Sequence, residues 1–329
     1  MTLSDCAAKY SRRSYLVLLV LVLFGLFPSR PVSARGLFVA VIMTGDLESY
    51  RQAHAAFMEK IEGTIPDDGG VEVYLQTPNP DPISWANSIR KAVGIGADII
   101  ITYGASATLA AKSEVRKTPV LFADVYDPVA LHLVRDPLRP GGNLSGISSK
   151  TPLETLVKTF REIHAVRSMG VLFSSSDLGS LLQVKKIEDL GSGFGFEVLK
   201  RDIEDPREIS EALSFLADRI DSLYITESPA LHLGLGEVVD FSRGKSLPLL
   251  GQIPGLSDGG GLISLEADPV EQGELLADCL RQILDGRKIG DLPIRTPRKV
   301  SLVINLNVAR SLGYKVPFQA LSMATRVIR

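Results

Sequence analysis

The chain has 329 residues, of which 45% are hydrophobic and 22% charged, a globular composition with enough apolar material for two hydrophobic cores. Its 36 Lys and Arg nearly balance its 38 Asp and Glu, which leaves a net charge of −2. No dense basic stripe with interleaved aromatic residues occurs, so nucleic acid binding is not expected. Two lobes are the expected organisation.

The N-terminus has the features of a signal peptide. Lys9, Arg12 and Arg13 precede the uncharged run Tyr15–Phe27, which has the length of a signal h-region and is short for a membrane span. Small residues before Ala34 predict cleavage after it, so residues 1–34 are predicted to be a signal peptide and the mature chain to be periplasmic. A retained membrane anchor is the alternative, and the Arg pair leaves both the secretory and the twin-arginine routes open.

Cysteine and histidine usage predicts neither a disulfide nor a metal site. Cys6 would leave with the signal, which leaves Cys279 as the only mature cysteine, and no Cys follows the apolar run as a lipid-anchored protein would require. The His residues at 54, 132, 164 and 232 lack ligand spacing. This usage predicts no metal site and no lipid anchor. We also expect the mature protein to be a soluble monomer without a cofactor.

From residue 37 onward, short apolar runs alternate with segments of helical periodicity. Helices of about ten residues between successive buried strands indicate parallel strands with right-handed crossovers. The first half predicts strands at Phe38–Ile42, Val71–Leu75, Ala97–Tyr103 and Val120–Ala123, and helices at Tyr50–Ile61 and Ile83–Val93, with a further helix beginning near Gly104. This pattern predicts one doubly wound lobe.

The second half repeats the plan. It predicts strands at Met169–Phe173, Phe196–Lys200, Ser222–Ile225 and Leu247–Leu250, and helices at Leu181–Leu190 and Pro206–Ala217. The predicted fold class is therefore α/β, with two doubly wound parallel-sheet lobes that form a cleft where they face each other.

Two glycine-rich patterns would indicate enzymes but lack the required context. Gly255-Leu256-Ser257-Asp258-Gly259 fits the G-x-S-x-G hydrolase pattern, but a strand-like segment follows it and the last His, His232, precedes it. Gly191-Ser192-Gly193-Phe194-Gly195 misses the dinucleotide-binding spacing by one position and connects a helix to a strand. The chain is not expected to be an enzyme.

Candidate ligand-binding residues follow the carboxyl ends of the strands, where ligands bind in open parallel sheets. Thr44 and Asp46 follow the first strand. The small-residue loop Gly104, Ala105 and Ser106 precedes a helix, whose free N–H groups suit a carboxylate; simple capping by Ser106 is the alternative.

The next strand ends supply groups of other kinds. Asp124 and Tyr126 follow the fourth strand, where a carboxylate can hold an ammonium group and a ring can stack on a flat ligand. Thr226, Glu227 and Gln252 end the corresponding strands of the second lobe. The pattern therefore predicts a site built from both lobes.

The order of several motifs carries a family resemblance. These are Gly104–Thr108, Thr118–Ala123, Asp127–Val129, Arg139–Asn143, Met169–Phe173, Glu271–Ala277 and Val300–Ala309. Together they resemble the extracytoplasmic substrate-binding proteins of ABC transporters, in particular the family that includes tryptophan and tyrosine carriers. The resemblance covers nearly all of the chain after residue 36.

The resemblance implies the type I periplasmic-binding arrangement, with a hinge of three crossings. It places the crossings near Asn143–Ile147, Gly261–Leu265 and Leu292–Arg298, and it packs Glu271–Leu284 on the first lobe. The implied lobes are 35–146 plus about 265–293, and 147–264 plus about 294–329.

The implied function is that of a solute-binding protein of an ABC importer. Such a protein captures a small polar or amphipathic ligand, for example an amino acid or a related compound, by hinge closure and hands it to a membrane permease. The segment Gln252–Leu256 departs from the acidic or Ser-rich segment of amino-acid carriers, which argues against an aromatic amino acid. A periplasmic ligand-sensing module that signals to a membrane receptor is the alternative.

Overall fold

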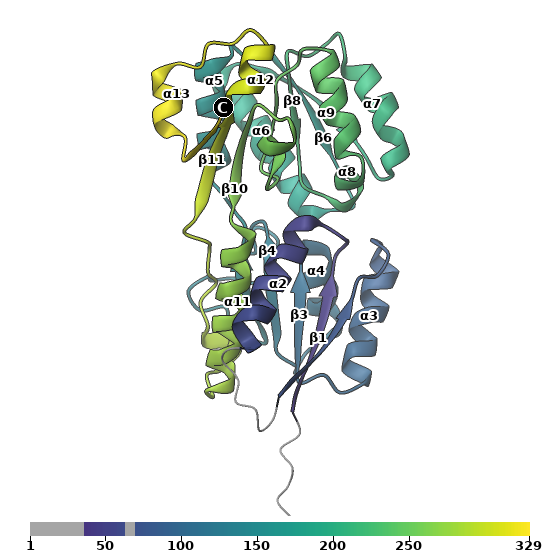
Figure 1. The fold of residues 1–329 in the computed structure, drawn as a ribbon. Helices are drawn as coiled ribbons and strands as arrows, with labels where there is room; N and C mark the ends of the chain where they lie inside the picture. Colours follow the sequence, from purple (N-terminus) through teal and green to yellow (C-terminus); the bar gives the residue numbers. More distant parts are fainter. Residues whose placement is uncertain (1–35, 63–69) are drawn as a thin grey trace, which may run out of the picture. The chain divides into compact units, whose positions relative to one another are not determined.

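The computed structural model describes residues 36–62 and 70–329, and these residues form two α/β lobes (Figure 1). The predicted signal peptide at residues 1–34 lies outside the described residues. The first lobe contains β1 (Leu37–Met43), α2 (Glu48–Glu62), β2 (Val71–Gln76), α3 (Pro82–Gly94), β3 (Ile99–Tyr103), α4 (Ala105–Glu114), β4 (Val120–Val125), β5 (Leu144–Ser148), α11 (Pro269–Leu284) and the 3₁₀ helix η2 (Ile289–Asp291).

The second lobe contains the remaining described elements. These are α5 (Leu153–Ile163), β6 (Ser168–Phe173), α6 (Leu178–Phe194), β7 (Glu197–Asp202), the 3₁₀ helix η1 (Pro206–Glu208), α7 (Ile209–Leu216), β8 (Ser222–Ile225), α8 (Pro229–Leu233), α9 (Leu235–Gly244), β9 (Leu249–Gly251), α10 (Leu256–Gly259), β10 (Ile263–Ala267), β11 (Val300–Asn305), α12 (Leu306–Ser311), α13 (Phe318–Met323) and β12 (Arg326–Ile328).

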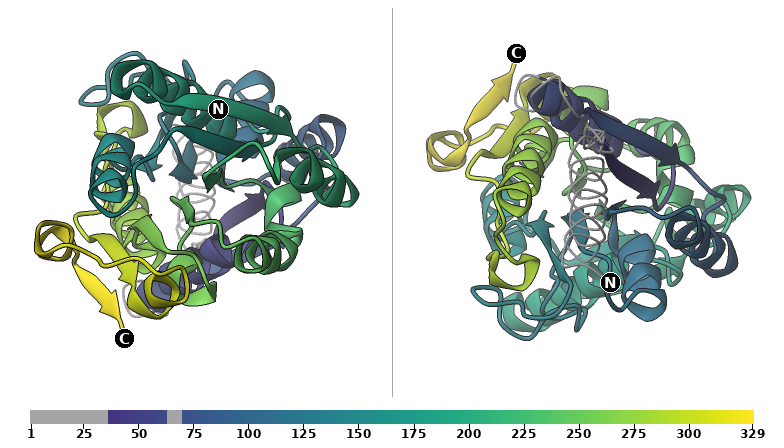
Figure 2. Two further views of the ribbon diagram at one scale, coloured as in Figure 1. Left: turned by 90° about the horizontal axis from the view of Figure 1, so that it is seen from above. Right: turned by 90° about the horizontal axis from the view of Figure 1, so that it is seen from below.

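Each lobe is built on one sheet. The first sheet has the order β2-β1-β3-β4-β5, and all of its pairs are parallel. The second has the order β12-β11-β10-β9-β8-β6-β7, in which β10 and β11 are antiparallel and the other pairs parallel. The C-terminal strand β12 lies at the outer edge of this sheet (Figure 2). These sheets confirm the predicted fold class of two parallel-sheet α/β lobes.

Helices cover both faces of the first sheet. On one face, Phe57 of α2 and Leu276 and Leu280 of α11 pack against Val39 and Ile101 of the sheet. The other face packs against α3 and α4 through Trp85, Ile89 and Ala107, among others. Two-sided burial explains why these strands are continuous apolar runs rather than alternating ones.

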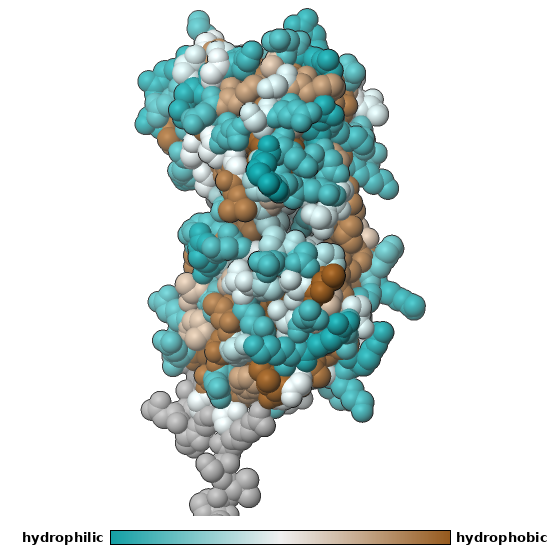
Figure 3. Space-filling model, turned by 90° about the vertical axis from the view of Figure 1, so that its right-hand side faces the viewer, coloured by the Kyte–Doolittle hydropathy of each residue, from teal (hydrophilic) through white to brown (hydrophobic). Residues whose placement is uncertain are grey.

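The second sheet is covered in the same way. One face packs against α5 and α6 through residues such as Leu156, Phe160 and Ile187. The other packs against α7 and α9 through Leu213 and Val238. Each lobe therefore has its own core, and the surface is indented where the two lobes meet (Figure 3).

The sheets show where the chain passes between the lobes. The segments Asn143–Ile147 and Gly261–Leu265, predicted as crossings, mostly form β5 and β10, because their apolar residues pair with neighbouring strands and are buried. The chain passes between the lobes directly after each of these strands, and a third time between Arg295, which bridges to Ile147, and β11. α11 packs along α2 of the first lobe (Figures 1 and 2).

The strands that were predicted, β1 to β4 and β6 to β9, begin and end within about two residues of their predicted limits, and β8 matches its prediction at Ser222–Ile225. The strands β11 and β12 had not been predicted. One predicted helix is divided: Pro206–Ala217 begins as the 3₁₀ turn η1, capped by the Asp205 side chain, and continues as α7. The capping box at Asp205 and Glu208 explains the tight first turn.

Candidate functional site

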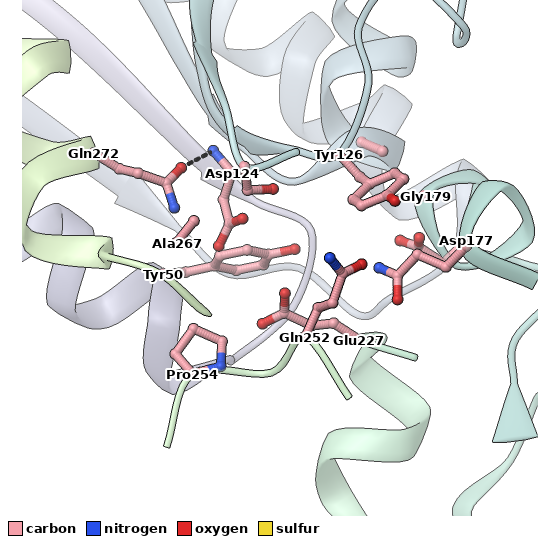
Figure 4. Close-up of a pocket in the computed structure, with 13 residues that line it drawn as sticks. Tyr50, Asp124, Tyr126, Asp177, Gly179, Glu227, Gln252, Pro254, Ala267 and Gln272 are labelled. Carbon is pink, nitrogen blue, oxygen red and sulfur yellow. Dashed lines mark hydrogen bonds between the residues drawn. The ribbon is translucent and has the colours of Figure 1, made fainter. Parts of the chain in front are cut away.

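A pocket lies at the junction of the two lobes (Figure 4). The empty space between its lining atoms, open solvent included, amounts to about 520 Å³. Its lining comes from both lobes and from the segments that join them: Tyr50, Ala105, Asp124, Tyr126, Ser149, Asp177, Gly179, Gln183, Glu227, Gln252, Pro254, Ala267 and Gln272.

Asp124 is the central carboxylate of the first lobe. The pairing of β4 with β5 shifts register between Phe122 and Val125, and Asp124 in this irregularity adopts φ +54°. A bulge of this kind redirects a side chain, and positive φ in a residue other than glycine is typical of functional sites. The irregularity turns the Asp124 carboxylate from the end of the strand into the pocket.

The environment of Asp124 leaves part of its carboxylate unsatisfied. Its backbone N–H donates to Oε1 of Gln272 on α11 at 2.9 Å, so α11 fixes this position (Figure 4). Only 7% of Asp124 is exposed, and its Oδ2 is buried without a hydrogen-bond partner among the described residues. Burial raises the pKa of Asp124, and the hydroxyls of Ser149 and Ser49 offset part of this shift.

Glu227 faces Asp124 from the second lobe. The Ser49 hydroxyl of α2 donates to Glu227 Oε1 at 3.0 Å, a hydrogen bond that joins the two lobes. Burial, with the negative charges of Asp124 and Asp177 nearby, raises the pKa of Glu227 well above its usual range. A cation between Asp124 and Glu227 would offset the cost of burying the two ionised carboxylates and would reduce the repulsion between them.

Asp177 is the third carboxylate of the pocket. It is the N-cap of α6, where its Oδ1 accepts the Ser180 N–H at 2.8 Å. Burial raises its pKa to about 6, against the lowering effect of the backbone N–H groups of Ser180 and Gly179, and the charge of Asp124 adds to the increase.

The N-terminus of α4 forms a polar wall beside Tyr50. Gly104 is its N-cap and provides no capping side chain; the Ala107 N–H donates to Oγ1 of Thr44 at 3.1 Å. At Gly104, φ is +88° and ψ 164°, and an added Cβ would lie 2.3 Å from the Tyr50 hydroxyl oxygen. Glycine is therefore required for Tyr50 to reach the pocket.

The glutamines of the second lobe are held by the protein itself. The Tyr224 hydroxyl donates to Gln183 Oε1 at 2.7 Å, and the Gln252 amide donates to Thr151 Oγ1. Tyr126 lies across the pocket, close to Gly179 of α6, where the two lobes approach each other. These contacts orient the amide groups and one aromatic ring at the pocket.

The structure brings five of the ten predicted site residues to the pocket: Ala105, Asp124, Tyr126, Glu227 and Gln252. The other five, Thr44, Asp46, Gly104, Ser106 and Thr226, do not line it.

These five have other positions for physical reasons. Thr44 caps α4, and Thr226 is fully buried with its hydroxyl 2.6 Å from that of Ser180. Asp46 is exposed and pairs with Arg51. Gly104 and Ser106 belong to the first turn of α4, where only Ala105 reaches the pocket.

Several lining residues were not predicted. Tyr50, Gln183 and Gln272 lie on helices and carry no local signal that separates them from surface residues. Asp177 did have a signal, because it follows β6, the first strand of the second lobe, as Asp46 follows β1, the first strand of the first lobe. Gln272 lies within the motif Glu271–Ala277 that carried part of the family resemblance.

Two α/β lobes with parallel sheets, joined by three segments and with a pocket at their junction, define the class of type I periplasmic binding proteins. Residues 55–328 match the model of the ABC transporter substrate binding protein family. The chain belongs to this family.

Known proteins of several kinds are similar to the chain. A tyrosine-binding protein of Clostridioides difficile (strain R20291) is 25% identical over 266 residues, which cover 80% of this chain and 77% of the relative. The ABC domain from Streptococcus pneumoniae in complex with L-Trp superposes with a TM-score of 0.82 at 24% identity, covering 89% of this chain and all of that one. A leucine-binding protein from Thermotoga maritima gives a TM-score of 0.58 at 16% identity, covering 78% and 86% of the two chains.

Substrate-binding proteins of ABC transporters act outside the cytoplasm, and this chain belongs to such a family. Within residues 36–62 and 70–329, no helix is both long and apolar enough to cross a membrane.

Proposed function

We propose that this protein is the periplasmic solute-binding component of an ABC importer, exported by its N-terminal signal peptide, and that it captures a small amino compound, an amino acid or a relative of one, by closing its lobes. The observation that carries this proposal is the Asp124 carboxylate, which is buried in the pocket and whose Oδ2 has no hydrogen-bond partner within residues 36–62 and 70–329. A ligand ammonium group would supply the missing donors, because charge-assisted hydrogen bonds are the strong ones.

Closure of the lobes is proposed because the pocket residues that would contact the ligand come from both lobes. Asp124 belongs to the first lobe and Glu227 to the second, so a ligand that contacts both stabilises the arrangement in which the lobes meet. Two direct contacts between the lobes support such a closed arrangement: the hydrogen bond from Ser49 to Glu227 and the close approach of Gly45 to Pro229. The ligand therefore does not have to form every contact between the lobes. A permease in the membrane would then distinguish the closed form from the open one.

We propose binding without chemistry. Ser257, the candidate nucleophile of the G-x-S-x-G pattern, is fully buried, with its hydroxyl 2.7 Å from that of Ser264 and donating to the Val303 carbonyl at 3.3 Å. Its hydroxyl therefore serves the packing of α10 against the sheet.

The test is a thermal-shift screen of residues 35–329 against amino acids, amines, sugars, nucleosides and short carboxylates, followed by small-angle X-ray scattering with any ligand found. A ligand at a hundredfold excess over its Kd adds about 2.7 kcal/mol of stability. Stabilisation by an amino compound together with a smaller radius of gyration is the expected result. Stabilisation only by sugars or nucleosides, or binding without compaction, would contradict the proposal.

A further inference from the structure

The charges that line the pocket do not balance. Asp124, Asp177 and Glu227 all line it, and its lining, as given by the described residues, contains no Lys, Arg or His. Carboxylates buried together without a cation are costly, since each keeps only part of its hydration and repels the others. Among the residues that the structure describes, none forms a hydrogen bond with the buried Asp124 oxygen Oδ2, so this part of the cost is not offset by them.

Basic residues next to lining residues in the sequence are engaged elsewhere. Lys150 follows Ser149, but it is exposed and pairs with Asp127 at 2.5 Å. Arg51 follows Tyr50, but it pairs on the surface with Asp46 and with Glu48. Neither side chain neutralises the pocket.

Helix ends do not balance the charges either. The N-termini of α4 and α6 reach the pocket, and each contributes roughly half a positive charge. Together they offset about one of the three carboxylates. Even with one proton held between Asp124 and Glu227, the pocket therefore keeps a net negative charge.

We infer that the ligand of this pocket is an organic cation, in which ammonium groups outnumber carboxylates. This inference rests on the proposed function and narrows it. A zwitterion with its carboxylate at the N–H groups of α4 and its ammonium at Asp124 would add no net charge, and the remaining carboxylates would stay uncompensated. Amines without a carboxylate, diamines and basic amino acids all meet the requirement.

The arrangement of the three carboxylates indicates two anionic regions. Asp124 and Glu227 both lie beside Ser49 and Tyr50, where one ammonium can contact groups of both lobes. Asp177 lies on the side of Tyr126 and α6, beyond Gln252 in Figure 4. A ligand would contact both anionic regions if it placed an amine at the first region and a second amine or a polar group at Asp177.

The experiment compares matched pairs that differ in net charge by calorimetric titration of residues 35–329. The pairs are tyramine and tyrosine, tryptamine and tryptophan, lysine and norleucine, and 1,4-diaminobutane and 4-aminobutyrate. In at least one pair we expect the cationic member to bind about ten- to a hundredfold more tightly, the range that one buried charge-assisted contact gives.

A test variant and a control variant each remove one carboxylate by an isosteric change from Asp to Asn. Asp177→Asn should reduce the preference for the cation by about tenfold, whereas Asp240→Asn, which removes a charge from an exposed pair with Arg243, should leave it unchanged. The melting temperature of each unliganded variant shows whether it is folded. An unchanged preference in folded Asp177→Asn would overturn the role of that carboxylate and the inference with it.

The outcomes separate this inference from the proposed function. If zwitterions bind as tightly as their cationic partners or more tightly, the inference is wrong and the proposed function stands. If no amino compound binds, both are wrong.

Discussion

Asp124 is the residue on which the proposed site depends most. In Asp124→Asn the side chain keeps its size but loses its charge, so the unliganded protein should melt at the same temperature or higher, because a buried, incompletely satisfied carboxylate is destabilising. Stabilisation by the ligand should fall by at least about 1.5 kcal/mol, the usual contribution of a hydrogen bond to a charged group. Thermal shift with and without ligand measures both effects.

Asp240→Asn is the matched control for this change, since Asp240 forms an exposed pair with Arg243. If Asp124→Asn retained full stabilisation by ligand, the ligand site would lie elsewhere.

Gly104 determines whether Tyr50 can reach the pocket. Gly104→Ala should destabilise the protein by about 1 to 3 kcal/mol, because its φ of +88° with ψ of 164° strains any other residue and the new Cβ would lie 2.6 Å from Thr44 Oγ1. Ligand affinity should fall as well, since Tyr50 must move. Urea unfolding and titration with ligand measure the two effects.

Gly193→Ala provides the comparison, because Gly193 lies within α6 and an added Cβ would meet no atom within 4 Å. That variant should gain about 0.5 to 1 kcal/mol from the helix preference of Ala. Equal effects of the two substitutions would rule out the steric argument at Gly104.

At the scale of the element, the contact with α2 attaches the late helix α11 to the first lobe. At Gly273 an added Cβ would lie 2.0 Å from the Ala53 carbonyl oxygen, so the two helix backbones touch there. Gly273→Ala should destabilise the protein by about 1 to 3 kcal/mol through forced separation of the helices. It should also weaken ligand binding, because Gln272 beside it holds the backbone of Asp124.

The helical glycine Gly236 of α9 has open space around it and provides the control for this element. Chemical denaturation of Gly236→Ala should show equal or slightly higher stability. A Gly273→Ala variant as stable as the parent would show that α11 can shift without cost.

At the scale of the whole molecule, the buried carboxylates predict opposite effects of pH on stability and on ligand binding. Burial raises the pKa of Asp177 to about 6, and it also raises the pKa values of Asp124 and Glu227. The folded state therefore binds more protons than the unfolded state between about pH 4 and 6. The unliganded protein should become more stable as the pH falls from 7 through 6.

Binding of a cationic ligand should change in the other direction, because protonation removes the charges that attract it. Affinity should fall as the pH decreases through about 6, with uptake of protons by the free protein. The groups that face Asp177 and Glu227 are Asp124 and the hydroxyls of Tyr50 and Tyr126, and none of these adds a positive charge. Melting curves and ligand titrations at pH 5 to 8 measure how stability and affinity change with pH. In Asp177→Asn both changes should be smaller. Stability and affinity that change in the same direction with pH would contradict this prediction.

Much of the architecture was encoded locally. Strands such as β3 and β8 are continuous apolar runs that need burial on both faces, and the helices between them have one apolar face, so periodicity determined the α/β class and most of the first-lobe elements. Asp124, Tyr126, Glu227 and Gln252 lie at the ends of those strands and line the pocket, because parallel strands end at one edge of a sheet. Their contact with a ligand stays a prediction.

Only the tertiary structure decided which polar groups face the pocket. Thr44 and Thr226 occupy strand ends as Asp124 does, but their hydroxyls satisfy nearby donors and acceptors of the protein and are buried. Gln272 arrives from α11, about 150 residues along the chain, and its contact with Asp124 depends on the return of that helix to the first lobe. Such contacts depend on packing between distant segments, and no local pattern of residue types records them.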